Sequence, residues 1–141
     1  MTIKINKKQT WTMGKFMKQA WETADLQHFG KPISYDNNTY YLTIHDSQKK
    51  IQGALVCKES AGVIRVSELI IAPDHQRQGL GKQLMLKVEK LAKQHEVHKI
   101  YLETGKDWEA VKFYQSLGYQ ITGQHPKHHF KQDFVVFSKF L

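Results

Sequence analysis

The residues in this chain that are best suited to chemistry form a glycine turn, residues 76–82. Gly79 and Gly81 stand between an apolar stretch and a helical pattern. Glycine lets an anion approach the backbone where a Cβ would obstruct it, and a helix N-terminus presents unpaired N–H groups and the positive end of its dipole. Lys82 falls in the first helical turn, where a cation opposes that dipole unless an external anion is bound. The pattern predicts a pyrophosphate cradle rather than a simple helix cap.

The spacing of the turn distinguishes it from two common phosphate-binding motifs. A Walker loop would need a glycine in place of Gln76 and a Ser or Thr in place of Gln83. A dinucleotide-binding fingerprint would need a third glycine in place of Leu84. Both motifs fail, and the pattern that remains is Gln76-x-x-Gly79-x-Gly81.

This remaining pattern resembles the GNAT superfamily of N-acetyltransferases, in which a (Gln/Arg)-x-x-Gly-x-(Gly/Ala) turn holds the pyrophosphate of coenzyme A. A second match, Ala110-x-x-Phe113-Tyr114-x-x-x-Gly118-Tyr119, is similar to a later helix of that family and the turn after it. The two matches occur in the right order and are separated by a strand pattern. The resemblance covers roughly residues 40–124 well and the two ends loosely.

The resemblance implies an α/β fold in one domain, residues 1–141, with a mixed central sheet of about six to seven strands flanked by helices. In this family the central strand splays from the next strand, so its backbone can bond the pantetheine arm of acetyl-CoA like an added strand. Asp107 stands where many relatives carry Asn, and an ionised carboxylate cannot donate the hydrogen bond that an amide donates. The residues expected at the cofactor are Ile70, Ile71, Ala72, Gln76, Arg77, Gln78, Gly79, Leu80, Gly81, Lys82, Gln83 and Asp107.

The implied activity is that of an acyltransferase, an acetyl-CoA-dependent N-acetyltransferase that acts on a primary amine by direct transfer in a ternary complex. A lysine-type amine has a pKa of about 10.4 and needs a base at neutral pH. Glu68 and Glu103 are the two candidates, and each could instead be a structural ion pair. We favour Glu68, because an apolar strand face with Ile64 and Val66 would desolvate its carboxylate and favour the neutral form. The resemblance implies that Tyr114 protonates the leaving thiolate; core packing is its alternative role.

The elements that must position these residues follow from hydrophobic periodicity. Residues 66–72 predict a strand that Pro73 ends, and the stripe from Leu80 to Ala92 predicts the helix after the turn. Residues 108–117 predict a second helix, with Gly118 in the left-handed region after it. Residues 13–24 predict an amphipathic helix capped by Thr10 or Thr12. Further strands are expected at residues 2–5, 40–45, 51–58, 99–104, 119–122 and 134–140.

Composition limits the class of protein. The chain has 141 residues, 40% of them hydrophobic, and a formal net charge of +8, which favours an anionic partner such as coenzyme A. No run of 18 apolar residues and no leader-like segment are visible, so neither a membrane span nor secretion is expected. The single cysteine, Cys57, fits a reducing cytoplasm, and a buried structural thiol is expected there.

Several alternatives stay open at this point. A non-catalytic acyl-CoA sensor would share the fold, and a basic nucleic-acid binder would share the charge but lacks the known motifs, so no specific nucleic acid is expected. The segment from His125 to His129 holds three histidines, but without a cysteine or regular spacing we expect no metal there. It is expected to be a solvated loop or an acceptor-binding lid. The acceptor, a small-molecule or peptide amine, is not identified by the sequence, and a homodimer is left open.

Overall fold

The computed structural model describes all residues, Met1–Leu141, and divides them into two compact units. The helical unit, Met1–Tyr35, contains α1 (Trp11–Phe29). The sheet unit is Asp36–Leu141, and no helix of either unit is both long and apolar enough to cross a membrane. The elements of the sheet unit are β1 (Asn38–His45), β2 (Ile51–Ser60), β3 (Val63–Ile71), η1 (Pro73–His75), α2 (Leu80–Gln94), β4 (Lys99–Gly105), α3 (Ala110–Ser116), β5 (Gln120–His125), η2 (His129–Lys131) and β6 (Phe134–Phe140).

The helical unit confirms a helix over the predicted residues and Thr10 as its cap, but the apolar residues of its stripe, such as Phe16 and Trp21, are exposed. The backbone N–H of Met13 donates to Thr10 Oγ1 over 3.2 Å, and Gly30 ends the helix at φ 69° with its N–H bonded to the Leu26 carbonyl. The strand expected at residues 2–5 is wrong, because residues 1–10 contain no strand. Alternation of apolar residues forms a strand only where another strand pairs with it, and this segment has none.

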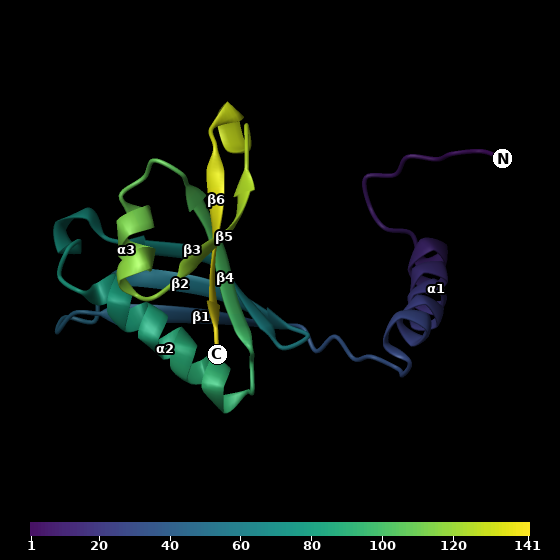
Figure 1. Ribbon diagram of the computed structural model, residues 1–141, viewed down its shortest axis with the longest axis horizontal. Helices are drawn as coiled ribbons and strands as arrows, with labels where there is room; N and C mark the ends of the chain where they lie inside the picture. Colours follow the sequence, from purple (N-terminus) through teal and green to yellow (C-terminus); the bar gives the residue numbers. More distant parts are fainter. The chain divides into compact units, whose positions relative to one another are not determined.

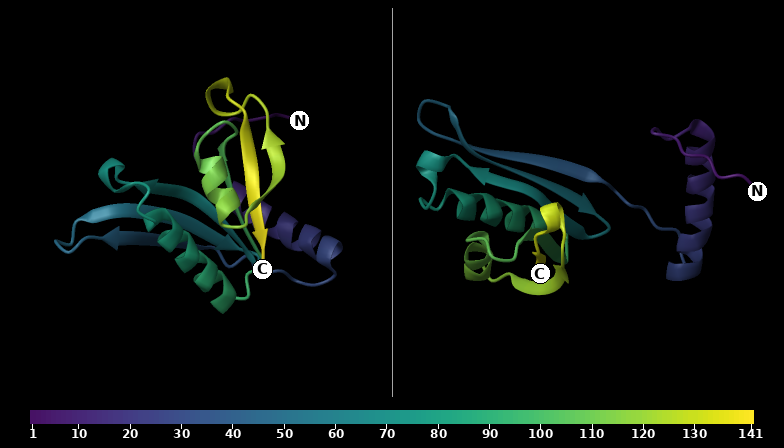
Figure 2. Two further views of the ribbon diagram at one scale, coloured as in Figure 1. Left: turned by 60° about the vertical axis from the view of Figure 1, so that its left-hand side comes forward. Right: turned by 90° about the horizontal axis from the view of Figure 1, so that it is seen from above.

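The sheet unit is built on one mixed sheet of six strands in the order β1-β2-β3-β4-β6-β5. All neighbours pair antiparallel except β3 and β4, which are parallel. Helices α2 and α3 lie over the same face of this sheet (Figure 2). The core between helices and sheet includes fully buried side chains of Leu55, Cys57, Ile64, Met85, Val88, Ile100 and Phe137. The fold is therefore the α/β arrangement that the sequence predicted.

The contact between β3 and β4 is short, and this confirms the predicted splay. The two strands pair only at Val63 with Lys99, Ile64 with Ile100, and Arg65 with Tyr101. Beyond these pairs β3 and β4 diverge (Figure 1). The edge of β3 that faces β4 therefore has no strand partner from residue 66 onward, and the Ile71 carbonyl accepts a hydrogen bond from the Gln76 side chain over 3.4 Å. The other edge of β3 still pairs with β2.

A bulge in β3 overturns the expectation that Glu68 lies on an apolar face with Ile64 and Val66. Val56 pairs with Glu68 while the next residue of β2, Cys57, pairs with Val66, so β3 has one extra residue between these pairs. An extra residue reverses the alternation of side chains along the strand. Beyond the bulge the core-facing side chains are Leu69 and Ile71, whereas Glu68 and Ile70 are exposed.

Helix α2 buries the apolar stripe that the hydrophobic periodicity predicted, and it also buries one carboxylate that this periodicity did not predict. Leu84, Val88 and Ala92 are buried, and so is Glu89. Lys139 Nζ on β6 donates to Glu89 Oε1 over 2.9 Å and to the Leu117 carbonyl over 2.9 Å. This half-buried pair ties α2 to β6. The second helix, α3, is shorter than predicted, because the chain from residue 108 enters it through tighter i to i+3 bonds.

Cys57 lies fully buried in the core, and burial followed by the nearby Glu59 carboxylate raises the pKa of its thiol from 9.0 to about 11. A raised pKa leaves the thiol protonated at neutral pH, and only the thiolate is an effective nucleophile. We expect native protein at pH 7.5 to resist iodoacetamide and unfolded protein in guanidinium chloride to be alkylated, as followed by intact mass. Alkylation of the native protein at the rate of the unfolded protein would contradict this burial.

Candidate functional site

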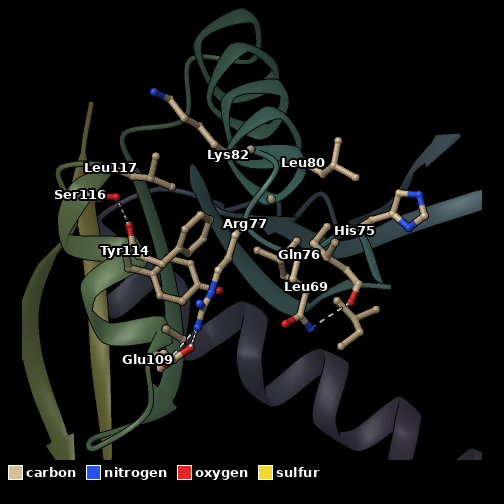
Figure 3. Close-up of a pocket in the computed structure, with 16 residues that line it drawn as sticks. Leu69, His75, Gln76, Arg77, Leu80, Lys82, Glu109, Tyr114, Ser116 and Leu117 are labelled. Atoms are coloured by element: carbon tan, nitrogen blue, oxygen red, sulfur yellow. Dashed lines mark hydrogen bonds and ion pairs between the residues drawn. The ribbon is translucent and has the colours of Figure 1, made fainter. Parts of the chain in front are cut away.

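The largest concentration of predicted site residues lines a cavity of about 510 Å³ at the end of β3 (Figure 3). Its walls come from the last residues of β3, the glycine turn and α3. The predicted residues that line it are Ile70, Ile71, Gln76, Arg77, Gly79, Leu80, Gly81, Lys82 and Tyr114. Residues from two sequence motifs therefore meet around one space, and the order of the strands explains the meeting: the turn follows β3, and α3 follows its neighbour β4.

The glycine turn presents backbone donors to the cavity. Gly79 is the N-cap of α2 in the left-handed region, at φ 78°, and no side chain caps the helix. The first N–H of α2 that finds a backbone acceptor is that of Gln83, which donates to the Gly79 carbonyl over 3.0 Å. The first turn contains Lys82 and no acidic residue. Unpaired N–H groups, a helix dipole and a cation thus converge on one place, which is the chemistry that a phosphate group requires.

Gly81 brings the two helices of the cavity together. A Cβ built at this position would lie 3.3 Å from Cζ of Phe113 on α3, a distance tighter than most real contacts. A side chain at Gly81 would therefore push α3 away from the start of α2. The second glycine of the motif is explained by this close approach, and the first by its left-handed backbone.

Arg77 and Glu109 form an ion pair at the cavity that the sequence motifs did not reveal. Arg77 lies in the turn at φ 60°, and its Nη2 is 3.4 Å from both carboxylate oxygens of Glu109, as Figure 3 shows. Both side chains are more than four-fifths exposed. An exposed pair of this kind contributes little stability, about 0–1 kcal/mol, so an incoming anion can replace Glu109 as the partner of Arg77 at small cost.

Tyr114 combines a packed ring with a place in the cavity wall. The side chain is 7% exposed, and its ring contacts Phe113, Tyr119 and Phe137 with centroid distances of 5.0, 6.1 and 5.8 Å. Burial raises the pKa of Tyr114 from 10.0 to about 12. The hydroxyl therefore carries its proton throughout the neutral range, which is the state that a general acid needs.

Four residues expected at the cofactor lie outside the cavity lining: Ala72, Gln78, Gln83 and Asp107. Ala72 donates its N–H to the Gln52 carbonyl over 2.8 Å, and the Gln78 side chain donates to the Asp74 carbonyl over 3.3 Å. The two candidate bases also lie outside it. Glu68 is exposed beyond the bulge, and Glu103 lies on β4.

Glu103 is the centre of a group of charged side chains that we call the Glu103 cluster: Glu103, Arg65, His125 and His128. The carboxylate is 3.7 Å from Arg65 Nη2 and 3.8 Å from one ring nitrogen of each histidine. The two imidazole rings stack with centroids 4.9 Å apart. Arg65 is the last residue of β3 that pairs with β4, so the cluster lies where the two strands begin to separate. No group of three or more His, Cys, Asp or Glu residues is arranged to hold a metal ion.

Comparison with known proteins agrees with the architecture. A family model described as an acetyltransferase (GNAT) domain matches residues 6–134. The chain therefore belongs to the GNAT acetyltransferase family, and it is an acyltransferase that uses acetyl-CoA.

Solved structures share this fold at low sequence identity. An acetyltransferase from Bacillus cereus ATCC 14579 is 20% identical with a TM-score of 0.77, over 98% of both chains. A GNAT family acetyltransferase from Elizabethkingia anophelis with acetyl-CoA bound is 21% identical with a TM-score of 0.63, over 68% of this chain and 72% of that one. The ribosomal-protein-S18-alanine N-acetyltransferase from Escherichia coli is 16% identical with a TM-score of 0.67, over 95% of this chain and 79% of that one.

The glycine turn predicts a matched pair of variants. Gly79 and Gly30 both have φ near 70–80° with no atom within 4 Å of an added Cβ, but only Gly79 lines the cavity. Valine at either position should cost about 1–2 kcal/mol of backbone strain. Acetyl-CoA at about 100 times its Kd should stabilise the wild type and Gly30→Val by about 2.7 kcal/mol, and Gly79→Val far less, because the new side chain would intrude on the phosphate position. Thermal unfolding with and without acetyl-CoA measures this, and equal shifts in both variants would contradict the cradle.

Proposed function

We propose that this protein transfers the acetyl group of acetyl-CoA directly to a primary amine, with both substrates bound at once. The observation that carries the proposal is the meeting of a free β-strand edge with a phosphate cradle and a protonated tyrosine in one cavity. A non-catalytic acyl-CoA sensor would bind the thioester without turnover. Release of the coenzyme A thiol in the presence of a panel of amines, with product mass as the second readout, separates the two functions.

Cofactor binding uses the backbone more than the side chains. The pantetheine arm would lie along the free edge of β3, where Ile70 and Ile71 supply backbone groups as in strand addition. The pyrophosphate would meet the N–H groups at the start of α2, with Lys82 and Arg77 supplying positive charge. Arg77 would exchange Glu109 for a phosphate oxygen. Contacts from Ala72, Gln78, Gln83 and Asp107 stay predictions, because they would have to arise outside the cavity lining.

We assign the base to Glu103 in place of Glu68. The case for Glu68 depended on an apolar face, and the bulge in β3 removes that face. Glu103 is less exposed, with 22% of its side chain accessible, and it lies where β3 and β4 separate. A carboxylate at this place can take the proton of an acceptor ammonium directly or through one water, and His125 and His128 can pass it to solvent.

The base assignment predicts unequal effects of two conservative variants. Glu103→Gln should lower kcat at pH 7 by about 10²-fold and flatten the acid limb of the pH profile, because the amide cannot accept the proton. Glu68→Gln should leave kcat within about threefold of the wild type and serves as the matched control. The measurement is thiol release between pH 6 and 9. The reverse result would return the role of base to Glu68. If neither variant changes kcat, the proton is taken by solvent or by a histidine.

The bond changes balance with Tyr114 as the acid. The amine nitrogen attacks the thioester carbonyl carbon, the C–S bond breaks, and its electron pair stays on the sulfur. Glu103 receives one proton of the ammonium before attack, and the nitrogen loses a second proton to solvent as the amide forms. The Tyr114 hydroxyl gives its proton to the departing thiolate. The products are an N-acetyl amine and coenzyme A, and Tyr114 is reprotonated from solvent.

Tyr114→Phe tests the acid role, because it removes the hydroxyl and keeps the ring that packs on Phe113 and Phe137. We expect kcat to fall about 10²-fold while KM for acetyl-CoA and the melting temperature change little. A thiolate leaves moderately well without a proton, so some activity should remain. Since the pKa of Tyr114 is raised to about 12, wild-type kcat should show no loss from tyrosine ionisation up to pH 10. Full turnover with lost stability would instead make the hydroxyl structural.

A further inference from the structure

We propose that the acceptor is an amine that also carries a carboxylate, of the amino-acid type, and that Glu103 and Arg65 bind its two charged ends. The inference deepens the proposed function and rests on it, because it assigns the acceptor ammonium to Glu103. Its starting point is that the assigned base does not stand alone. It is part of an ion pair at the point where the strands separate.

The Glu103–Arg65 pair matches the charges of a zwitterion in sign and spacing. Arg65 Nη2 and Glu103 Oε2 are 3.7 Å apart, and the side chains are 49% and 22% accessible. The ammonium nitrogen and the nearer carboxylate oxygen of an α-amino acid are about 3 Å apart by standard bond lengths. Such a molecule can place its ammonium on Glu103 and its carboxylate on Arg65 together. Guanidinium groups bind carboxylates in a bidentate manner that suits this role.

A hollow beside Arg65 has the charge that the acceptor carboxylate requires. It measures about 450 Å³, and Arg65 and Lys58 are the cations among the residues that line it. Its one carboxylate, Glu59, is already engaged: Glu59 Oε2 accepts from the Tyr40 hydroxyl over 2.9 Å and lies 2.8 Å from His95 Nδ1. With two cations, Arg65 and Lys58, and one carboxylate in its lining, the hollow has a net positive charge.

The surroundings of Glu103 also disfavour acceptors with several positive charges. Besides Arg65, the carboxylate has His125 and His128 within 3.8 Å, and the whole chain carries a net charge of +8. A polyamine or an aminoglycoside would bring further ammonium groups next to Arg65 and Lys58, and like charges across a contact cost affinity. Electrostatics here favour an acceptor whose remaining charge is negative.

The test compares free α-amino acids with the matching amino-acid amides, which differ only in the carboxylate. The amine of an amide is less protonated at neutral pH, so intrinsic reactivity favours the amide. We nevertheless expect kcat/KM to favour the free acid by about tenfold or more in the wild type. Arg65→Gln should raise KM for the acid, so that the ratio of kcat/KM for the acid to kcat/KM for the amide falls to about one or below. Arg65→Lys should keep part of the preference for the acid.

Arg77→Gln is the matched control, because Arg77 is the other arginine of the chain and lines the cofactor cavity. It should raise KM for acetyl-CoA and leave the ratio of acid to amide unchanged. A wild type that prefers amides or spermidine, or an Arg65→Gln variant that keeps the preference for the acid, would overturn the inference.

A binding measurement separates this inference from the proposed function. Calorimetry of amino acid and amide against the wild type saturated with coenzyme A needs no turnover. Binding of the acid that Arg65→Gln abolishes supports the inference even where transfer is slow. Acetylation of other amines without any binding of the acid overturns the inference and leaves the proposed function intact. Stabilisation by acetyl-CoA with no acetylation of any amine overturns the proposed function, and with it the acceptor role assigned here.

Discussion

The short parallel contact between β3 and β4 is the constraint on which the site depends. Only three residue pairs join the strands before they diverge. If the ladder continued, the free edge of β3 would be hydrogen-bonded to β4 and could not take up an extended ligand. The divergence also exposes Glu103 near Arg65 at the point of separation. One local loss of pairing thus leaves both an unpaired edge of β3 and an accessible Glu103, the two features that the proposed reaction needs.

The start of α2 shows how a local departure from stability can serve function. A helix with Lys82 in its first turn and no capping side chain is less stable than one with Ser or Asp at its N-cap. Arg77 adds a second cation in a left-handed conformation that favours glycine. Both residues lower the stability of the protein without a ligand, and both would favour the binding of an anion. Such conflicts are expected mainly at functional sites.

Much of the fold could be predicted from the sequence because it depends on local patterns. The period of apolar residues located α2 and β6, and Gly118 marked the left-handed residue after α3 with φ 85°. The strand expected at residues 2–5 did not form, because an alternating pattern in one segment does not provide a second strand to pair with it. The bulge before Glu68 could not be predicted, because it is a property of the register between β2 and β3 rather than of either strand.

The site was predictable to the same extent. The glycine turn and Tyr114 are contiguous motifs, and both line the cavity. The pairs Arg77–Glu109 and Arg65–Glu103 each join residues on different elements, so no local pattern reveals them. The order of the elements along the sequence explains why the two motifs lie at one end of the sheet. It does not predict which charged side chains form ion pairs there.

The choice between two buried tyrosines illustrates what the structure adds. Tyr114 and Tyr119 belong to the same motif, their rings are in contact, and burial raises the pKa of both. Tyr119 is 2% exposed, does not line the cavity, and has the Glu89 carboxylate as a further cause of its raised pKa. The Tyr119 hydroxyl therefore does not face a ligand in the cavity. Tyr114 has the same protonated hydroxyl and also reaches the cavity. Access to the cavity, rather than acidity, is therefore the reason that Tyr114 and not Tyr119 is the proposed acid.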